Sequence, residues 1–149
     1  MNKADIEALF RYTDWANARV LRQAAQVSPE QYTAAAPVPQ GSLRGALVHT
    51  LAAEVTWRRR WQGDSPTSLL SESDLPTFEA LADRWEQEAD ALREFIASLT
   101  DDDLNRTVQY KTTKGLPIKD VLWHLMVHVV NHGTQHRSEA AILRISCQV

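Results

Sequence analysis

The sequence predicts an all-α protein, a four-helix bundle formed by a single domain that spans residues 1–149. Three observations support this fold class. Four long stretches repeat apolar residues at steps of three and four, as one face of an amphipathic helix does. A strand-like pattern occurs in one short segment only. The length is ordinary for one domain, which buries roughly 70% of its unfolded surface and needs no disulfide.

Capping residues set the limits of the first two helices. The first is expected from about Lys3 to Val27, with Asn2 as its N-cap. A short turn capped by Ser28 follows, and then a loop rich in proline and glycine. The second helix is expected over Leu43–Gln62 and stops at the Gly-Asp-Ser-Pro sequence of residues 63–66.

The second half of the chain predicts two further helices with a short non-helical segment between them. Thr77 caps the third helix, which ends before the break at Thr100–Asp103. Residues 106–115 are rich in Thr, Val and Tyr and include a Lys-Gly turn, so a short hairpin or an extended link is expected there. The fourth helix is expected from Pro117 or Ile118 to about Ile145.

Composition excludes several classes of protein. The formal net charge of -3 argues against a general grip on nucleic acid, although residues 57–61 read Trp-Arg-Arg-Arg-Trp. Basic residues in the last turns of a helix have a simpler role, because they complement its negative end. The apolar runs are too short for a membrane span. Cys147 is the single cysteine, so no intrachain disulfide forms, and a cytoplasmic location is expected.

The histidines carry the strongest functional signal. His124, His128, His132 and His136 recur at every fourth position, and each step turns the side chain by only about 40° around a helix. Neighbouring rings therefore share one side of the fourth helix, where two of them can bind one metal ion. His49, inside the second helix, is the remaining histidine and can supply a third ligand.

The pattern narrows the kind of metal site. The sequence contains no Glu-x-x-His and no His-Glu-x-x-His, which disfavours a ferritin-like di-iron centre and a zincin protease. One cysteine is too few for a structural zinc finger. Three imidazoles leave an open coordination position, the arrangement of a catalytic metal, and they suit zinc, nickel, iron or copper.

The second helix has apolar or small residues on two sides. Leu43, Leu47 and Leu51 belong to its strongest apolar stripe, whereas His49 lies on another face with Gly45 and further small residues. Burial on two sides leads us to expect that one side faces the bundle pocket and the other faces a partner subunit. A homodimer is therefore expected.

Three segments give the chain a resemblance to a known family. They are Tyr12–Asn17 in the first helix, Gly41–His49 followed by Glu54 and Trp57 in the second, and the most specific, His128–Arg137, in the fourth. Together they resemble the DinB-like (DinB/YfiT-like) family of metal-binding four-helix bundles. The resemblance implies that His49, His132 and His136 are the metal ligands. Where family members commonly have Gly-Gln after His-Arg, this chain has Ser138-Glu139.

The same resemblance implies a range of activities. Some relatives are transferases or isomerases that use low-molecular-weight thiols, and many have no known reaction. The expected cofactor is a divalent ion, zinc or nickel first and iron or manganese next, with a thiol or another small molecule as substrate. Either a thiol or water can be the activated nucleophile. The alternative is a non-catalytic protein in which the metal ties two helices together or binds a small ligand.

Other residues are candidates for the pocket or for contacts with the ligands. His128 fits the family pattern without being counted as a ligand, and a plain packing role suits it equally well. Tyr12 and Trp57, with Trp15 and Trp123, are candidates for pocket walls, although aromatic residues on such helices more often form the core. Glu54 lies about 140° around the helix from His49, so it is expected to reach a neighbouring helix or solvent.

Overall fold

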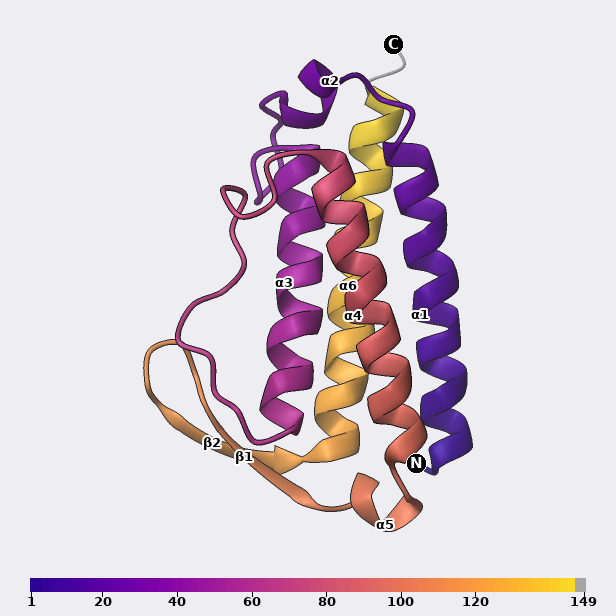
Figure 1. The fold of residues 1–149 in the computed structure, drawn as a ribbon, viewed down its shortest axis with the longest axis vertical. Coiled ribbons are helices and arrows are strands. Elements are labelled where there is room, and N and C mark those ends of the chain that lie inside the picture. Colours follow the sequence, from indigo (N-terminus) through magenta and orange to yellow (C-terminus); the bar gives the residue numbers. More distant parts are fainter. Residues whose placement is uncertain (147–149) are drawn as a thin grey trace.

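Four long helices run side by side in the computed structural model, which describes residues 1–146 (Figure 1). This confirms the predicted bundle. The elements in chain order are α1 (Lys3–Ala24), α2 (Pro29–Thr33), α3 (Leu43–Trp61), α4 (Phe78–Ser98), α5 (Asp101–Leu104), β1 (Thr107–Lys111), β2 (Pro117–Val121) and α6 (Leu122–Ser146). Helix α6 packs on α1 and α3, and α4 packs on the same two helices from the other side. Within residues 1–146, no helix is both long and apolar enough to cross a membrane.

Side-chain caps begin three of the long helices at the predicted residues. Asn2, Ser42 and Thr77 are extended in backbone conformation, and each side chain accepts a hydrogen bond from the backbone N–H three residues later. Each cap of this kind stabilises a helix by about 1 kcal/mol, because it satisfies a donor that the first turn leaves unpaired. The cap residues therefore fix where α1, α3 and α4 begin.

The segment between α4 and α6 is a hairpin, and it corrects the predicted start of the fourth helix. Pro117–Val121 forms strand β2, which pairs antiparallel with β1, so α6 begins only at Leu122. The turn between the strands ends at Gly115, which has the positive φ of 78° that glycine adopts without strain. Pro117 is tolerated because it is the first residue of its strand.

Two other boundaries differ in detail from the sequence prediction. Helix α1 ends at Ala24 rather than near Val27. The expected break at residues 100–103 includes a short helix, α5, whose cap is the Thr100 side chain. Three consecutive Asp residues in this helix complement the positive end of its dipole.

Helix α3 is the most deeply buried of the long helices, and its own chain covers it. Helices α4 and α6 pack along it, and strand β1 packs near its C-terminal end. The backbone carbonyl of Gln40 lies against Gly45, and residues of the connection to α4, including Pro66 and Leu69, lie beside Thr56. Burial on two sides therefore does not require a partner subunit, and the homodimer remains a prediction.

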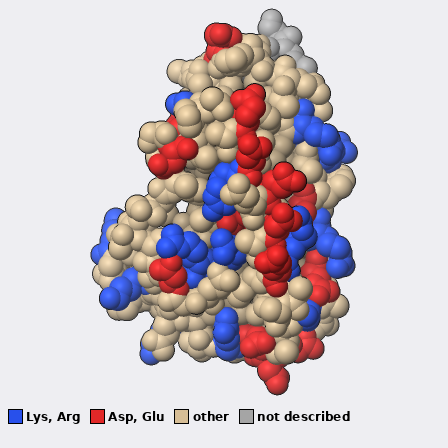
Figure 2. All heavy atoms as spheres, in the orientation of Figure 1, with Lys and Arg blue, Asp and Glu red and all other residues tan. Residues whose placement is uncertain are grey.

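Charged side chains of both signs lie on the face shown in Figure 2, with acidic ones in a column over α4. Several basic residues are engaged in ion pairs within the chain. Arg58 binds Glu88 through two nitrogens, and Arg59 pairs with Asp64. The basic stretch at the end of α3 is therefore largely neutralised locally by acidic partners.

Candidate metal centre

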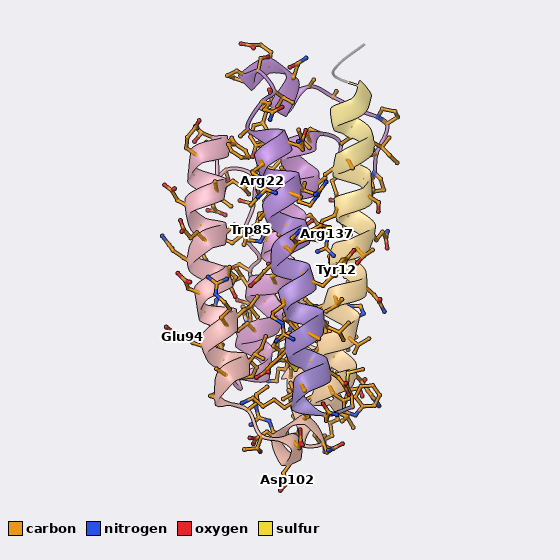
Figure 3. The ribbon with its side chains drawn as sticks, turned by 90° about the vertical axis from the view of Figure 1, so that its right-hand side faces the viewer. Tyr12, Arg22, Trp85, Glu94, Asp102 and Arg137 are labelled. Atoms are coloured by element: carbon orange, nitrogen blue, oxygen red, sulfur yellow. The ribbon has the colours of Figure 1, made fainter. Side chains whose placement is uncertain are left out.

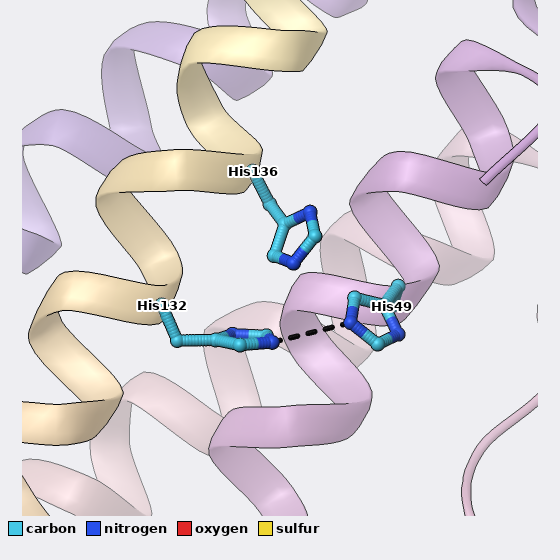
Figure 4. A group of neighbouring side chains, drawn as sticks. All are labelled: His49, His132 and His136. Carbon is cyan, nitrogen blue, oxygen red and sulfur yellow. Dashed lines mark hydrogen bonds between the residues drawn. The ribbon is translucent and has the colours of Figure 1, made fainter. Parts of the chain in front are cut away.

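Three histidines from two helices point at one another in the middle of the bundle (Figure 4). His49 comes from α3, and His132 and His136 come from successive turns of α6. The Nε2 atoms of His49 and His132 lie 3.2 Å apart, and the His136 ring centroid lies 4.5 Å from that of His49 and 4.4 Å from that of His132. The structure thus brings together the three residues that the family resemblance indicated as ligands.

The geometry suits one small cation. One nitrogen from each ring lies within 4.8 Å of the other two, which places all three around a common point. Zinc–nitrogen bonds of about 2.0–2.1 Å in a tetrahedron place two ligand nitrogens about 3.3 Å apart. The 3.2 Å between the Nε2 atoms of His49 and His132 is close to that separation. These residues therefore fit a divalent ion without a large rearrangement.

Glu139 fixes the chemical form of His136. Its Oε2 atom accepts a hydrogen bond from Nδ1 of His136 at 2.8 Å, one helical turn along α6. The carboxylate can only accept, so the His136 proton is placed on Nδ1 and the Nε2 lone pair is left free. A carboxylate bound to the outer nitrogen of a histidine is the usual partner of a metal ligand. Sequence reasoning missed this role, although the spacing of three residues was a usable signal.

The environment keeps two of the rings neutral. Burial lowers the pKa of His49, and the neighbouring His136 lowers it further. Burial lowers the pKa of His132 to about 4, with additional contributions from the three histidines around it. Because only neutral imidazole binds a metal, these residues are ready to act as ligands at neutral pH.

His128 and Trp57 border the cluster on one side. The His128 ring is exposed and lies 6.1 Å from His132 and 5.3 Å from Trp57, measured between ring centroids. Trp57 also meets Tyr110 of β1 edge-on at 5.1 Å. Both residues therefore lie between the histidine cluster and the hairpin.

Glu54 lies away from the cluster, in a buried network that joins all four long helices. Its carboxylate accepts hydrogen bonds from Asn17 Nδ2 on α1 at 2.9 Å and from Trp85 Nε1 on α4 at 3.0 Å. Arg137 on α6 donates to Asn17 Oδ1 at 3.0 Å. Trp85 and Arg137 appear at similar heights on the two sides of α1 in Figure 3. Glu54 thus reaches neighbouring helices, one of the two outcomes expected for it.

Burial in this network raises the pKa of Glu54 to about 7. Complete burial is the main cause, and the hydrogen bonds from Asn17 and Trp85 oppose it. The Arg137 side chain lies against Gly133, where an added Cβ would come within 2.7 Å of a guanidinium nitrogen. This contact accounts for a glycine inside α6. The sequence did not reveal the network, because its members are scattered over four helices.

The remaining candidate residues lie elsewhere. Tyr12 is half-exposed and packs against Trp15, next to Thr134 and Arg137. Those two α6 residues lie about 140–160° around the helix from His132, so Tyr12 is not brought to the cluster. His124 is exposed and pairs with Asp120, and Trp123 packs beside the core. Cys147 lies outside the described residues.

Comparison with known proteins supports the same grouping. Residues 1–144 match the DinB family. The chain is 24% identical over 142 residues to Protein DinB of Bacillus subtilis (strain 168), covering 91% of this chain and 83% of that protein. The histidine cluster and the capped bundle lie within the matched region. The chain therefore belongs to the DinB family.

Proposed function

We propose that this protein is a divalent-metal-dependent enzyme that activates a small-molecule nucleophile at His49, His132 and His136. The observation that carries the proposal is the meeting of three ring nitrogens, within 4.8 Å of one another, from two helices. Three protein ligands leave at least one coordination position free, which is the usual arrangement of a catalytic metal. Zinc or nickel fits an all-imidazole site best, and iron or manganese is the next choice.

The chain's own residues would hold the ion and admit a substrate. His136 is buried and oriented by Glu139, whereas His49 and His132 are only partly buried. The open side of the site is therefore next to His49, His132 and the exposed ring of His128. A small molecule can approach from there without displacing the core.

A thiol is the nucleophile we favour, with water as the second choice. A divalent ion in this site supplies a positive charge that lowers the pKa of a bound thiol or water. S-transfer ranks ahead of hydrolysis because thiol-dependent relatives occur among DinB-like proteins, as the resemblance implied. The expected cytoplasmic location and homodimer belong to this proposal and rest on the sequence alone.

A non-catalytic role is the alternative. The cluster joins α3 to α6, which pack closely along their length, so a bound metal would also tie these helices together. In that case the coordination shell is closed, or the open position binds a ligand without reaction.

Metal content tests the ligand assignment. Wild-type protein is expected to bind one divalent ion per chain by isothermal titration and elemental analysis. His49→Ala and His132→Ala should each lose stoichiometric binding, because two imidazoles remain. His124→Ala is the control, since His124 lies on the same helix but pairs with Asp120 instead. Full metal retention in His49→Ala and His132→Ala would refute the assignment.

Substitution with Co²⁺ distinguishes a catalytic metal site, which has an open coordination position, from a purely structural one. Co²⁺ reports its coordination through its visible spectrum, and a thiolate adds an intense near-ultraviolet charge-transfer band. A spectrum that changes on addition of a small thiol indicates an open position. A spectrum that no thiol or anion alters, together with no turnover in a thiol-transfer screen, would favour the structural role.

A further inference from the structure

The guanidinium of Arg60 is buried near the C-terminal end of α3 without an ion-pair partner. The residue is only 8% exposed, and its Nε atom has no hydrogen-bond partner in the described part of the chain. No carboxylate of residues 1–143 forms an ion pair with it, although its neighbours Arg58 and Arg59 both have one. Buried charges are normally paired, because removing an ion from water is costly.

Two aromatic rings flank this cation. The Arg60 Cζ atom lies 4.9 Å from the centroid of the Trp57 ring and 4.9 Å from that of Tyr110. Such cation–π contacts hold a guanidinium plane in place, but they do not satisfy its N–H donors. Burial accordingly lowers the pKa of Arg60, and the nearby Tyr110 only partly opposes this. The site is a rigid aromatic clamp around a positive charge that lacks an anion.

Arg60 lies on the same face of α3 as His49. The two residues are eleven positions apart, which is about three turns and roughly 16 Å along the axis. Side chains on a helix lean toward its N-terminus, so the Arg60 side chain leans toward His49. Ala53 and Trp57 lie between them on this face, and both are partly exposed.

This face of α3, from His49 to Arg60, forms one side of a strip, and the other side comes from α6 and the hairpin. His132 contacts His128, His128 contacts Trp57, and Trp57 contacts Tyr110. None of these four side chains is fully buried, so each presents part of its surface to solvent. A chain of neighbouring rings thus leads from the histidine cluster to Trp57 and Tyr110, which flank the guanidinium.

We propose that Arg60, clamped by Trp57 and Tyr110, binds an anionic group, a carboxylate in the simplest case, of an elongated substrate whose other end reaches the histidine cluster. This inference rests on the proposed function, since it assigns the substrate class of the same centre. A guanidinium binds a carboxylate with two parallel hydrogen bonds, which a neutral group cannot replace. The site selects ligands that carry an acid at the far end from the reacting atom.

Paired probes on Co²⁺-loaded protein test the proposal. The probes are mercaptoacetate, 6-mercaptohexanoate and 11-mercaptoundecanoate, each compared with the mercaptoalcohol of the same length. The thiolate charge-transfer band reports binding at the metal. When the probe is long enough to span the strip, the mercaptocarboxylate is expected to bind about tenfold tighter than the mercaptoalcohol of the same length. Mercaptoacetate, which is too short, should show no such preference over its alcohol.

Variants assign that preference to Arg60. In Arg60→Gln the preference for the long carboxylate should vanish, whereas alcohol binding and the Co²⁺ spectrum remain. Arg59→Gln is the matched control, because it removes the same charge from the next position, where the side chain is exposed and paired with Asp64. If Arg60→Gln does not fold, Arg60→Lys replaces it, and the preference is expected to fall severalfold because an ammonium lacks the paired donors.

The outcomes separate this inference from the proposed function. Failure of wild-type protein to bind Co²⁺ contradicts the metal centre itself. Normal Co²⁺ and thiol binding without a length-dependent preference for the carboxylate overturns the Arg60 site alone. A preference that persists in Arg60→Gln, or that Arg59→Gln removes equally, overturns it as well.

Discussion

Glu139 accepts a hydrogen bond from Nδ1 of His136 at 2.8 Å. A second histidine of α6, His124, has a similar carboxylate partner outside the cluster. There Asp120 lies 3.0 Å from Nδ1 of His124. The two pairs therefore provide a matched test of what a carboxylate contributes to a histidine in the site.

Glu139→Gln is expected to weaken divalent-metal binding by about tenfold or more, because the carboxylate that orients His136 and increases its basicity is lost. Isothermal titration with Zn²⁺ or Ni²⁺ measures the change. Asp120→Asn should leave the affinity unchanged. Equal losses in the two variants would mean that the effect reflects general electrostatics rather than the contact with His136.

Glu54 should make stability depend on pH in a predictable direction. Its pKa is raised by burial to about 7 in the folded protein, against an ordinary value of 4.5. The folded state therefore binds more protons between these values, so the contribution of Glu54 to stability is greatest below pH 4.5 and is lost as pH rises through 7.

The comparison of wild type with Glu54→Gln isolates this effect. Between pH 4.5 and 7, the wild-type free energy of unfolding is expected to fall by about 1–3 kcal/mol relative to the variant. Urea denaturation of metal-free protein across this range measures it, and the difference removes the contribution of other titrating groups. A difference that does not change with pH would show that Glu54 keeps its ordinary pKa.

Asn17 connects two buried ionisable groups, so its removal should be costly. Asn17→Ala leaves Glu54 Oε1 and an Arg137 N–H without their partner, for an expected loss of about 3 kcal/mol of unfolding free energy. Thermal and urea denaturation test this. The control is Asn131→Ala, an exposed site on α6, where a change within about 0.5 kcal/mol is expected. A loss no larger than in that control would rule out the network as a source of stability.

The two glycines inside helices should respond differently to alanine. At Gly45 a Cβ would lie 2.1 Å from the backbone oxygen of Gln40, which cannot move without displacing the loop. Gly45→Ala is therefore expected to cost about 2–4 kcal/mol. At Gly133 the obstacle is the Arg137 nitrogen that donates to Asn17, so the gain of about 1 kcal/mol of helix propensity from alanine is offset by disturbing that hydrogen bond. A stability change within about 1 kcal/mol is expected there, and a cost equal to that at Gly45 would contradict this reasoning.

Local signals predicted most of the fold. Asn2, Ser42 and Thr77 cap helices where expected, because a cap depends on residues three positions apart. The same locality misplaced the start of the last helix. The residues Ile118–Val121 are compatible with a helix or with a strand. They form a strand because they pair with Thr107–Lys111 on the other side of a turn, a contact that a local pattern does not reveal.

By itself, the sequence determined which side chains share a face of each helix. The four-residue spacing brings His132 and His136 together on α6, since helix geometry is repetitive and local. The position of His49 opposite them, the partners of Glu54 and the clamp around Arg60 were decided by tertiary structure alone. The contact between His49 and His132 joins residues 83 positions apart, and only the packing of whole helices fixes such distances.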